Sequence, residues 1–234
     1  MDQRSPQRLA RLTGLLFLVI VVCGMFATTA LDGFVVAGDA AATAENVRSG
    51  HTLFTAVLLG WTVLVAADAA VALPLYLLLR GVDGLLALLA TAFRLLFAAL
   101  LGVAVTGVFH AYALLGDPAR TGGGAAGGEV RASAELAAFD TAFLFGLVVF
   151  GVHLLCVGVL LYRSRYVPRA LGALVTAGGA AYVADSLLGL LVAGHGGTAS
   201  TVLLLPAALG ELGLTAWLLV KGVTTGRPHP KETV

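Results

Sequence analysis

The sequence predicts an all-α fold, a polytopic integral membrane bundle of six transmembrane helices with both termini in the cytoplasm. Hydrophobic residues make up 59% of the chain and charged residues 12%, far below the roughly 25% charged residues of soluble domains. A bilayer core about 30 Å thick needs roughly 20 helical residues, and six apolar runs reach that length. The runs are 9–31, 52–79, 85–115, 136–162, 168–193 and 200–220.

The runs are predicted to be helices because they are too long and too continuously apolar for barrel strands, which alternate over about ten residues. The first run has a basic lead and ends in Thr28-Thr29-Ala30, so a cleaved signal peptide is the alternative to a first membrane helix. Its apolar span exceeds the roughly 7–15 residues of a signal core. We therefore interpret it as a retained helix.

The segments between the runs are mostly short. Residues 38–47 read GDAAATAENV, which is typical of a short surface helix with Asp39 as its cap. Residues 116–133 are rich in glycine and predict a flexible outer loop, without the lysine and Ser/Thr context of a phosphate-binding loop. Pro168 is expected to open the fifth helix, while Pro74 and Pro206 fall inside the second and sixth.

Basic residues predict the orientation. Three arginines lie at one set of helix ends (Arg48, Arg120 and Arg131), against ten basic residues at the other. The richer side is expected to be cytoplasmic. This gives a cytoplasmic tail at 1–8, a membrane domain at 9–222 and a second cytoplasmic tail at 223–234. The predicted location is the inner (plasma) membrane of a bacterial cell.

Four ionisable residues fall near the middle of the predicted bilayer. Counting 1.5 Å per residue from the cytoplasmic ends puts all four at about 13–18 Å depth. A lone charge there costs about 2.5–3.5 kcal/mol, so these groups should face the bundle interior and pair with one another, with Arg94 expected within about 4 Å of an acid. The predicted buried cluster is Asp68, Arg94, His153 and Glu211.

A second polar layer is expected nearer the outer surface. It comprises His110, Asp140, Asp185 and Tyr182. Tyr182 is placed there because it shares a helical face with Asp185. The two cysteines, Cys23 and Cys156, lie in apolar helix and are read as small hydrophobic residues.

Several segments resemble, in order, the bacterial membrane family filed as domain of unknown function 4386. Its motif positions fall on Arg94, Asp140, His153, Asp185 and Glu211, and the resemblance implies no particular activity. The segments are GDAAATAENV, AFRLLFAALLG from Ala92, AFD ending at Asp140, GVHLLCVGVLLYRSRYVPRALG from Gly151, YVADSLL from Tyr182 and LPAALGELGLTAWLLVKG from Leu205.

Three functional classes are compatible with this pattern. We interpret the chain as a non-catalytic accessory, sensor or assembly protein whose buried charges select one helix arrangement. The first alternative is a small proton- or cation-coupled transporter in which Asp68, Glu211 and His153 bind or relay the cation. The second is an intramembrane lipid hydrolase that uses His110, Asp140 and Asp185 as metal ligands.

The predicted partners follow from the composition. Membrane lipids are expected, together with a membrane-protein partner or a second copy of the chain. A net charge of +1 gives no reason to expect nucleic acid. No cofactor and no metal ion are predicted, because the sequence has neither H-x-x-x-H nor H-E-x-x-H spacing.

Overall fold

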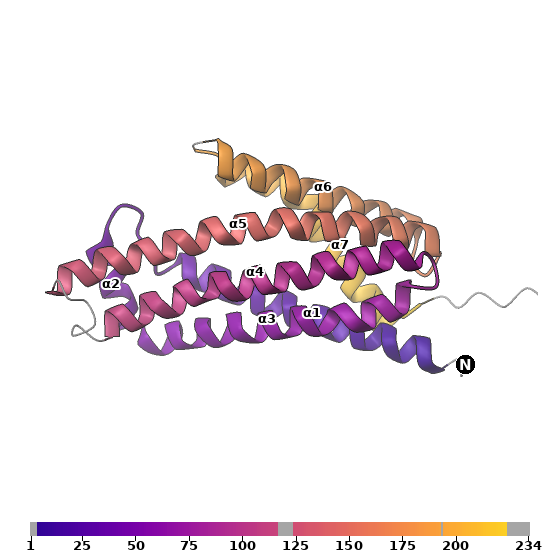
Figure 1. Ribbon diagram of the computed structural model, residues 1–234, viewed down its shortest axis with the longest axis horizontal. Helices are drawn as coiled ribbons and strands as arrows, with labels where there is room; N and C mark the ends of the chain where they lie inside the picture. The colour runs from indigo at the N-terminus through magenta and orange to yellow at the C-terminus, as the bar shows by residue number, and fades with distance from the viewer. Residues whose placement is uncertain (1–3, 117–123, 193, 224–234) are drawn as a thin grey trace, which may run out of the picture.

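The computed structural model describes residues 4–116, 124–192 and 194–223, and every regular element in these ranges is a helix (Figure 1). The predicted all-α class is therefore confirmed for the described chain. The helices are α1 (Arg4–Asp32), α2 (Ala40–Ser49), α3 (His51–Leu79), α4 (Gly84–Gly116), α5 (Gly124–Ser164), α6 (Arg169–Leu191) and α7 (Gly197–Val220).

Six of these helices are long and apolar enough to cross a bilayer, and α2 is the short exception. Even the shortest of the six, α6, has 23 residues, more than the roughly 20 that a hydrocarbon core of about 30 Å requires. The chain is thus a multi-pass membrane protein. The predicted number of spans is confirmed.

The six long helices form a closed ring in the order α1, α3, α4, α5, α6, α7, with α7 contacting α1 again. The closure is clearest near the ends of the chain. Gln7 Nε2 donates a hydrogen bond to the carbonyl of Val223 at 2.6 Å, and Gly14 packs against Leu218 and Leu219. The first turn of α1 and the last turn of α7 consequently lie on the same side of the bundle (Figure 1).

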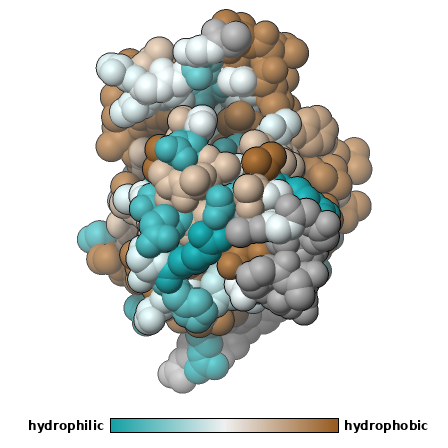
Figure 2. All heavy atoms as spheres, turned by 90° about the vertical axis from the view of Figure 1, so that its left-hand side faces the viewer, coloured by the Kyte–Doolittle hydropathy of each residue, from teal (hydrophilic) through white to brown (hydrophobic). Residues whose placement is uncertain are grey.

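The opposite end of the bundle carries α2 (Figure 1). Asp39 caps this helix, because its carboxylate accepts the backbone N–H of Ala42 at 2.9 Å. Arg48 of α2 pairs with Glu129 of α5 at 2.9 Å. Figure 2 shows polar side chains gathered on this end of the molecule, with apolar ones along its flanks. The predicted capped surface helix is confirmed.

The glycine-rich loop predicted over 116–133 is shorter than expected. Residues 117–123 lie outside the described residues, but α5 already begins at Gly124. Glycine costs a helix about 1 kcal/mol relative to alanine, so local preference disfavours this start. Contacts offset that cost, because Ala132 is buried and Glu129 is held by Arg48. Helix α1 begins at Arg4, within the predicted N-terminal tail, and residues 224–234 of the predicted C-terminal tail lie outside the described chain.

The helices α5 and α6 approach each other through glycines. A Cβ atom added to Gly151 would lie 2.7 Å from the carbonyl oxygen of Gly179, and one added to Gly179 would lie 2.7 Å from the oxygen of Gly151. Such distances are too short for any side chain, so backbones touch directly. This close packing holds α6 against the wall of the ring that carries His153.

Candidate functional site

Each helix of the ring contributes one side chain to a cluster in its interior. The four predicted ionisable residues lie together, and two aromatic residues join them. In ring order from α1, the members are Phe17, Asp68, Arg94, His153, Tyr182 and Glu211. We call this set the central cluster.

Asp68 and Arg94 form a buried ion pair at the centre of the cluster. Arg94 Nη2 lies 2.5 Å from Asp68 Oδ1, and each side chain is 1% exposed. The two atoms are close, but their angles do not meet the criteria for a hydrogen bond. The other carboxylate oxygen, Asp68 Oδ2, has no hydrogen-bond partner among the described residues. The expected pairing of Arg94 with an acid is therefore present. It joins α3 to α4 and removes two uncompensated charges from the membrane interior.

His153 positions the arginine from the other side. Its Nδ1 lies 2.8 Å from the carbonyl oxygen of Ala90, and its Nε2 lies 3.4 Å from Arg94 Nη1. A carbonyl only accepts and a guanidinium only donates, so Nδ1 carries the proton and Nε2 accepts. Both ring nitrogens of a neutral imidazole are thus engaged. This arrangement makes His153 a positioning residue for Arg94.

Two aromatic rings complete the surroundings of Arg94. Its guanidinium carbon lies 5.4 Å from the ring centroid of Phe17 and 5.1 Å from that of Phe150. Both distances fall within the roughly 6 Å of a cation–π contact. Sequence reasoning did not identify these rings, because a phenylalanine in an apolar run has the same pattern whether it faces lipid or the interior.

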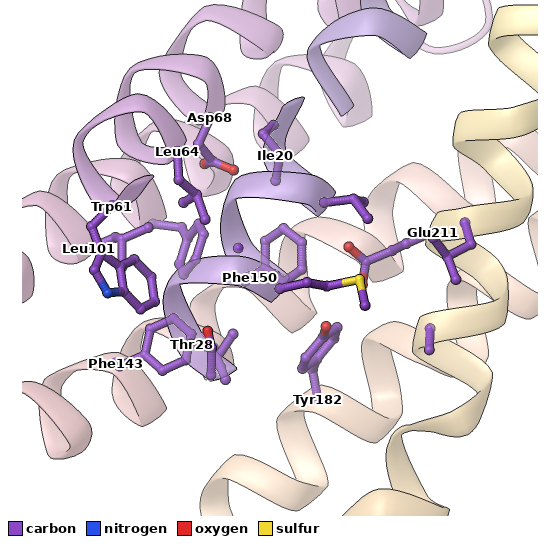
Figure 3. Close-up of a pocket in the computed structure, with 17 residues that line it drawn as sticks. Ile20, Thr28, Trp61, Leu64, Asp68, Leu101, Phe143, Phe150, Tyr182 and Glu211 are labelled. Atoms are coloured by element: carbon purple, nitrogen blue, oxygen red, sulfur yellow. The ribbon is translucent and has the colours of Figure 1, made fainter. Parts of the chain in front are cut away.

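Glu211 differs from the other acid because it has no basic partner. No ion pair within 4.0 Å links it to the described residues. Its neighbour is instead Tyr182, whose hydroxyl points toward the carboxylate (Figure 3). Tyr182 therefore belongs to the central cluster rather than with the outer polar residues. Counting depth along the sequence did not reveal this contact between α6 and α7.

A partly open cavity of about 260 Å³ adjoins the cluster. Asp68, Tyr182 and Glu211 supply its ionisable groups, and the oxygens of Asp68 and Glu211 point inward from different helices (Figure 3). Most of the remaining wall is apolar. Its aromatic side chains are Trp61, Phe97, Phe143 and Phe150. We call this space the intramembrane cavity.

The other residues of the predicted outer polar layer do not form one cluster, because each of them has different neighbours. His110 Nδ1 is 3.9 Å from Glu135 Oε2; the histidine side chain is largely exposed and the glutamate is partly buried. Asp140 lies near Asp32 and lines a different, more polar hollow beside α2. No three histidine, cysteine or acidic side chains among the described residues come close enough to hold a metal ion.

Asp185 fastens the turn between α6 and α7. Its Oδ1 lies 2.8 Å from His195 Nε2, and its Oδ2 accepts a hydrogen bond from Ser200 Oγ at 2.7 Å. Asp185 is 5% exposed, so these bonds satisfy a carboxylate that is otherwise enclosed. The contact pairs residues ten and fifteen positions apart. Sequence reasoning found Asp185 but neither partner.

Comparison with known proteins identifies the family of this chain. The family model described as Domain of unknown function (DUF4386) matches residues 12–222. The chain belongs to the DUF4386 family. The match takes in all six side chains of the central cluster and every residue that lines the intramembrane cavity. The resemblance inferred from the sequence motifs is confirmed.

The chain is also similar to a relative from Archaeoglobus fulgidus. That relative, described as an uncharacterized protein, is 28% identical over 165 residues, which cover 70% of this chain and 83% of the relative. No solved structure matches the chain. The functional argument therefore depends on the geometry of the cavity and the cluster.

Proposed function

We propose that this protein is a non-catalytic membrane protein of the sensor or accessory type, and that its intramembrane cavity binds a small lipid-soluble molecule. The observation that carries the proposal is the cavity itself. Its volume of about 260 Å³ lies just below the roughly 300–1,000 Å³ of ligand pockets, and its apolar wall surrounds a few polar groups.

The division of charge in the cluster supports this role. Arg94 contacts Asp68, His153 and two aromatic rings, so we assign it the structural role of holding neighbouring helices together. Glu211 has no comparable partner and faces the cavity. An ionisable group at membrane depth is costly and marks a site of interaction. We therefore assign the ion pair to structure and Glu211 to ligand binding.

For the orientation, we propose that both termini face the cytoplasm of a bacterial cell and that α2 lies outside the plasma membrane. The excess of arginine and lysine at the terminal side supports this orientation. A cysteine replacing Ser49, which is exposed at the end of α2, should react in intact cells with a membrane-impermeant maleimide. Labelling only after the cells are opened would reverse the orientation.

Binding in the cavity can be measured with tryptophan fluorescence. The chain has two tryptophans, and Trp61 lines the cavity. In a Trp217→Phe background we expect 1-bromohexane, a neutral heavy-atom quencher, to quench Trp61 in a saturable manner. The reason is that a bromoalkane held in the cavity stays close to Trp61, which lies in the cavity wall, whereas a quencher in bulk detergent rarely approaches a side chain that is 1% exposed.

Two matched substitutions on α7 control this measurement. Ala208 lines the cavity, so Ala208→Phe should fill it and abolish saturable quenching. Ala216 is exposed on the same helix and does not line the cavity, so Ala216→Phe should leave quenching unchanged. Equal, non-saturating quenching in all three proteins would refute binding in the cavity.

Proton-coupled transport is a second candidate, and one observation favours it. Glu211 lines the intramembrane cavity and also a smaller hollow of about 20 Å³ that reaches Arg94 and His153. An acid between two spaces is placed to exchange a proton with both. Proton flux into proteoliposomes that is lost in Glu211→Gln would favour transport over sensing.

A further inference from the structure

We propose that the intramembrane cavity selects amphiphiles that carry a protonated amine, and that Glu211 binds the ammonium group. This inference rests on the proposed function, since it names the class of molecule that the cavity binds. Three features support it: the charge balance of the cluster, the hydrogen-bond acceptors at the cavity and the composition of the wall.

The charge balance leaves room for one positive charge. Asp68 and Arg94 neutralise each other at 2.5 Å. His153 is neutral in its hydrogen-bonding arrangement. An ionised Glu211 is then a single uncompensated carboxylate, and a ligand with one positive charge balances it.

The second acid contributes an acceptor to the same space. Asp68 lines the cavity as the second acid, and its enclosed Oδ2 has no hydrogen-bond partner among the described residues. Leaving a buried acceptor without a partner is unfavourable, so this side of the cavity favours a hydrogen-bond donor. An ammonium group has three donors and no acceptor, so it matches the Glu211 carboxylate and the Tyr182 hydroxyl oxygen, with the Asp68 acid nearby in the same wall.

An organic cation fits this wall better than a metal ion. Hard metal ions take six or more oxygen ligands, whereas the side chains with oxygen atoms that line the cavity are those of Thr28, Asp68, Tyr182 and Glu211. The four other aromatic side chains and the aliphatic residues offer apolar surface to a hydrocarbon chain. Aromatic faces also attract an alkylammonium group by cation–π interaction.

Three probes of equal chain length test this selectivity. They are 1-bromohexane, 6-bromohexan-1-ol and 6-bromohexylamine, each titrated against the full-length Trp217→Phe protein and its Glu211→Gln derivative. Each probe is compared between the two proteins, so differences in detergent partitioning cancel. We expect Glu211→Gln to weaken the amine at least tenfold, because a hydrogen bond to a charged group is worth about 1.5–3 kcal/mol. The bromoalkane and the alcohol should change less than about twofold.

The outcomes separate this inference from the proposed function. Saturable binding of all three probes with no loss of amine affinity in Glu211→Gln would overturn amine selectivity and leave the cavity as a neutral binding site. Absence of saturable quenching by every probe would overturn the proposed function itself. Unchanged affinity of Glu211→Gln for 1-bromohexane shows that the variant retains its fold, so a selective loss of the amine supports the inference.

Discussion

Replacing Arg94 with leucine should destabilise the folded protein by about 3–5 kcal/mol, the usual cost of breaking a buried ion pair from one side. The substitution leaves Asp68 as an enclosed acid without its cation and removes the contacts to His153, Phe17 and Phe150. Thermal unfolding of the purified protein in detergent measures the effect. We expect a lower midpoint and a lower folded yield.

A double substitution identifies the cause of this loss. Adding Asp68→Asn to Arg94→Leu removes the uncompensated acid, so we expect recovery of roughly half of the lost stability. Arg80→Leu is the matched control, because Arg80 is exposed at the end of α3 and such surface changes usually stay within about 0.5 kcal/mol. If the double variant is no more stable than Arg94→Leu, charge pairing is not the stabilising factor.

Gly151→Val should produce the second large effect, a loss of about 1–3 kcal/mol or more from overpacking. A Cβ atom at residue 151 would lie 2.7 Å from the carbonyl oxygen of Gly179 and 3.0 Å from the backbone nitrogen of Val183. Because these are backbone atoms, the conflict is relieved only if α5 and α6 separate. Thermal unfolding should show a clearly lower midpoint.

Gly127→Val provides the control on the same helix. A Cβ atom there meets nothing within 4 Å, so the change tests helix propensity without a clash. We expect its unfolding midpoint to equal or slightly exceed that of the wild type. Similar losses in both variants would mean that glycine matters for backbone freedom in α5 rather than for the contact with α6.

The helices were predictable from the sequence because membrane spans depend mainly on length and apolar composition. The surface helix α2 was predictable because a side-chain cap is a local signal, and Asp39 does accept from Ala42. The start of α5 could not be predicted from the sequence, because glycines at 124, 127 and 128 are typical of a flexible linker. The contacts that hold this turn, such as Arg48 with Glu129, join residues 81 positions apart.

The central cluster was predictable in part for a different reason. A charge at membrane depth is costly enough that its partner must lie at the same depth, which placed Asp68, Arg94, His153 and Glu211 together. Depth does not specify the neighbours around a ring. The contact of Tyr182 with Glu211 and the aromatic rings beside Arg94 therefore emerged only from the three-dimensional arrangement.

Glu211→Gln distinguishes a binding site from a packing element most directly. Thermal unfolding and 6-bromohexylamine binding should be measured on the same sample, in the Trp217→Phe background. Glutamine keeps an acceptor for Tyr182 and a similar shape. We predict an unfolding midpoint close to that of the parent protein together with at least tenfold weaker amine binding. A large fall in the midpoint with unchanged amine affinity would contradict a binding role for Glu211 and assign it to helix packing.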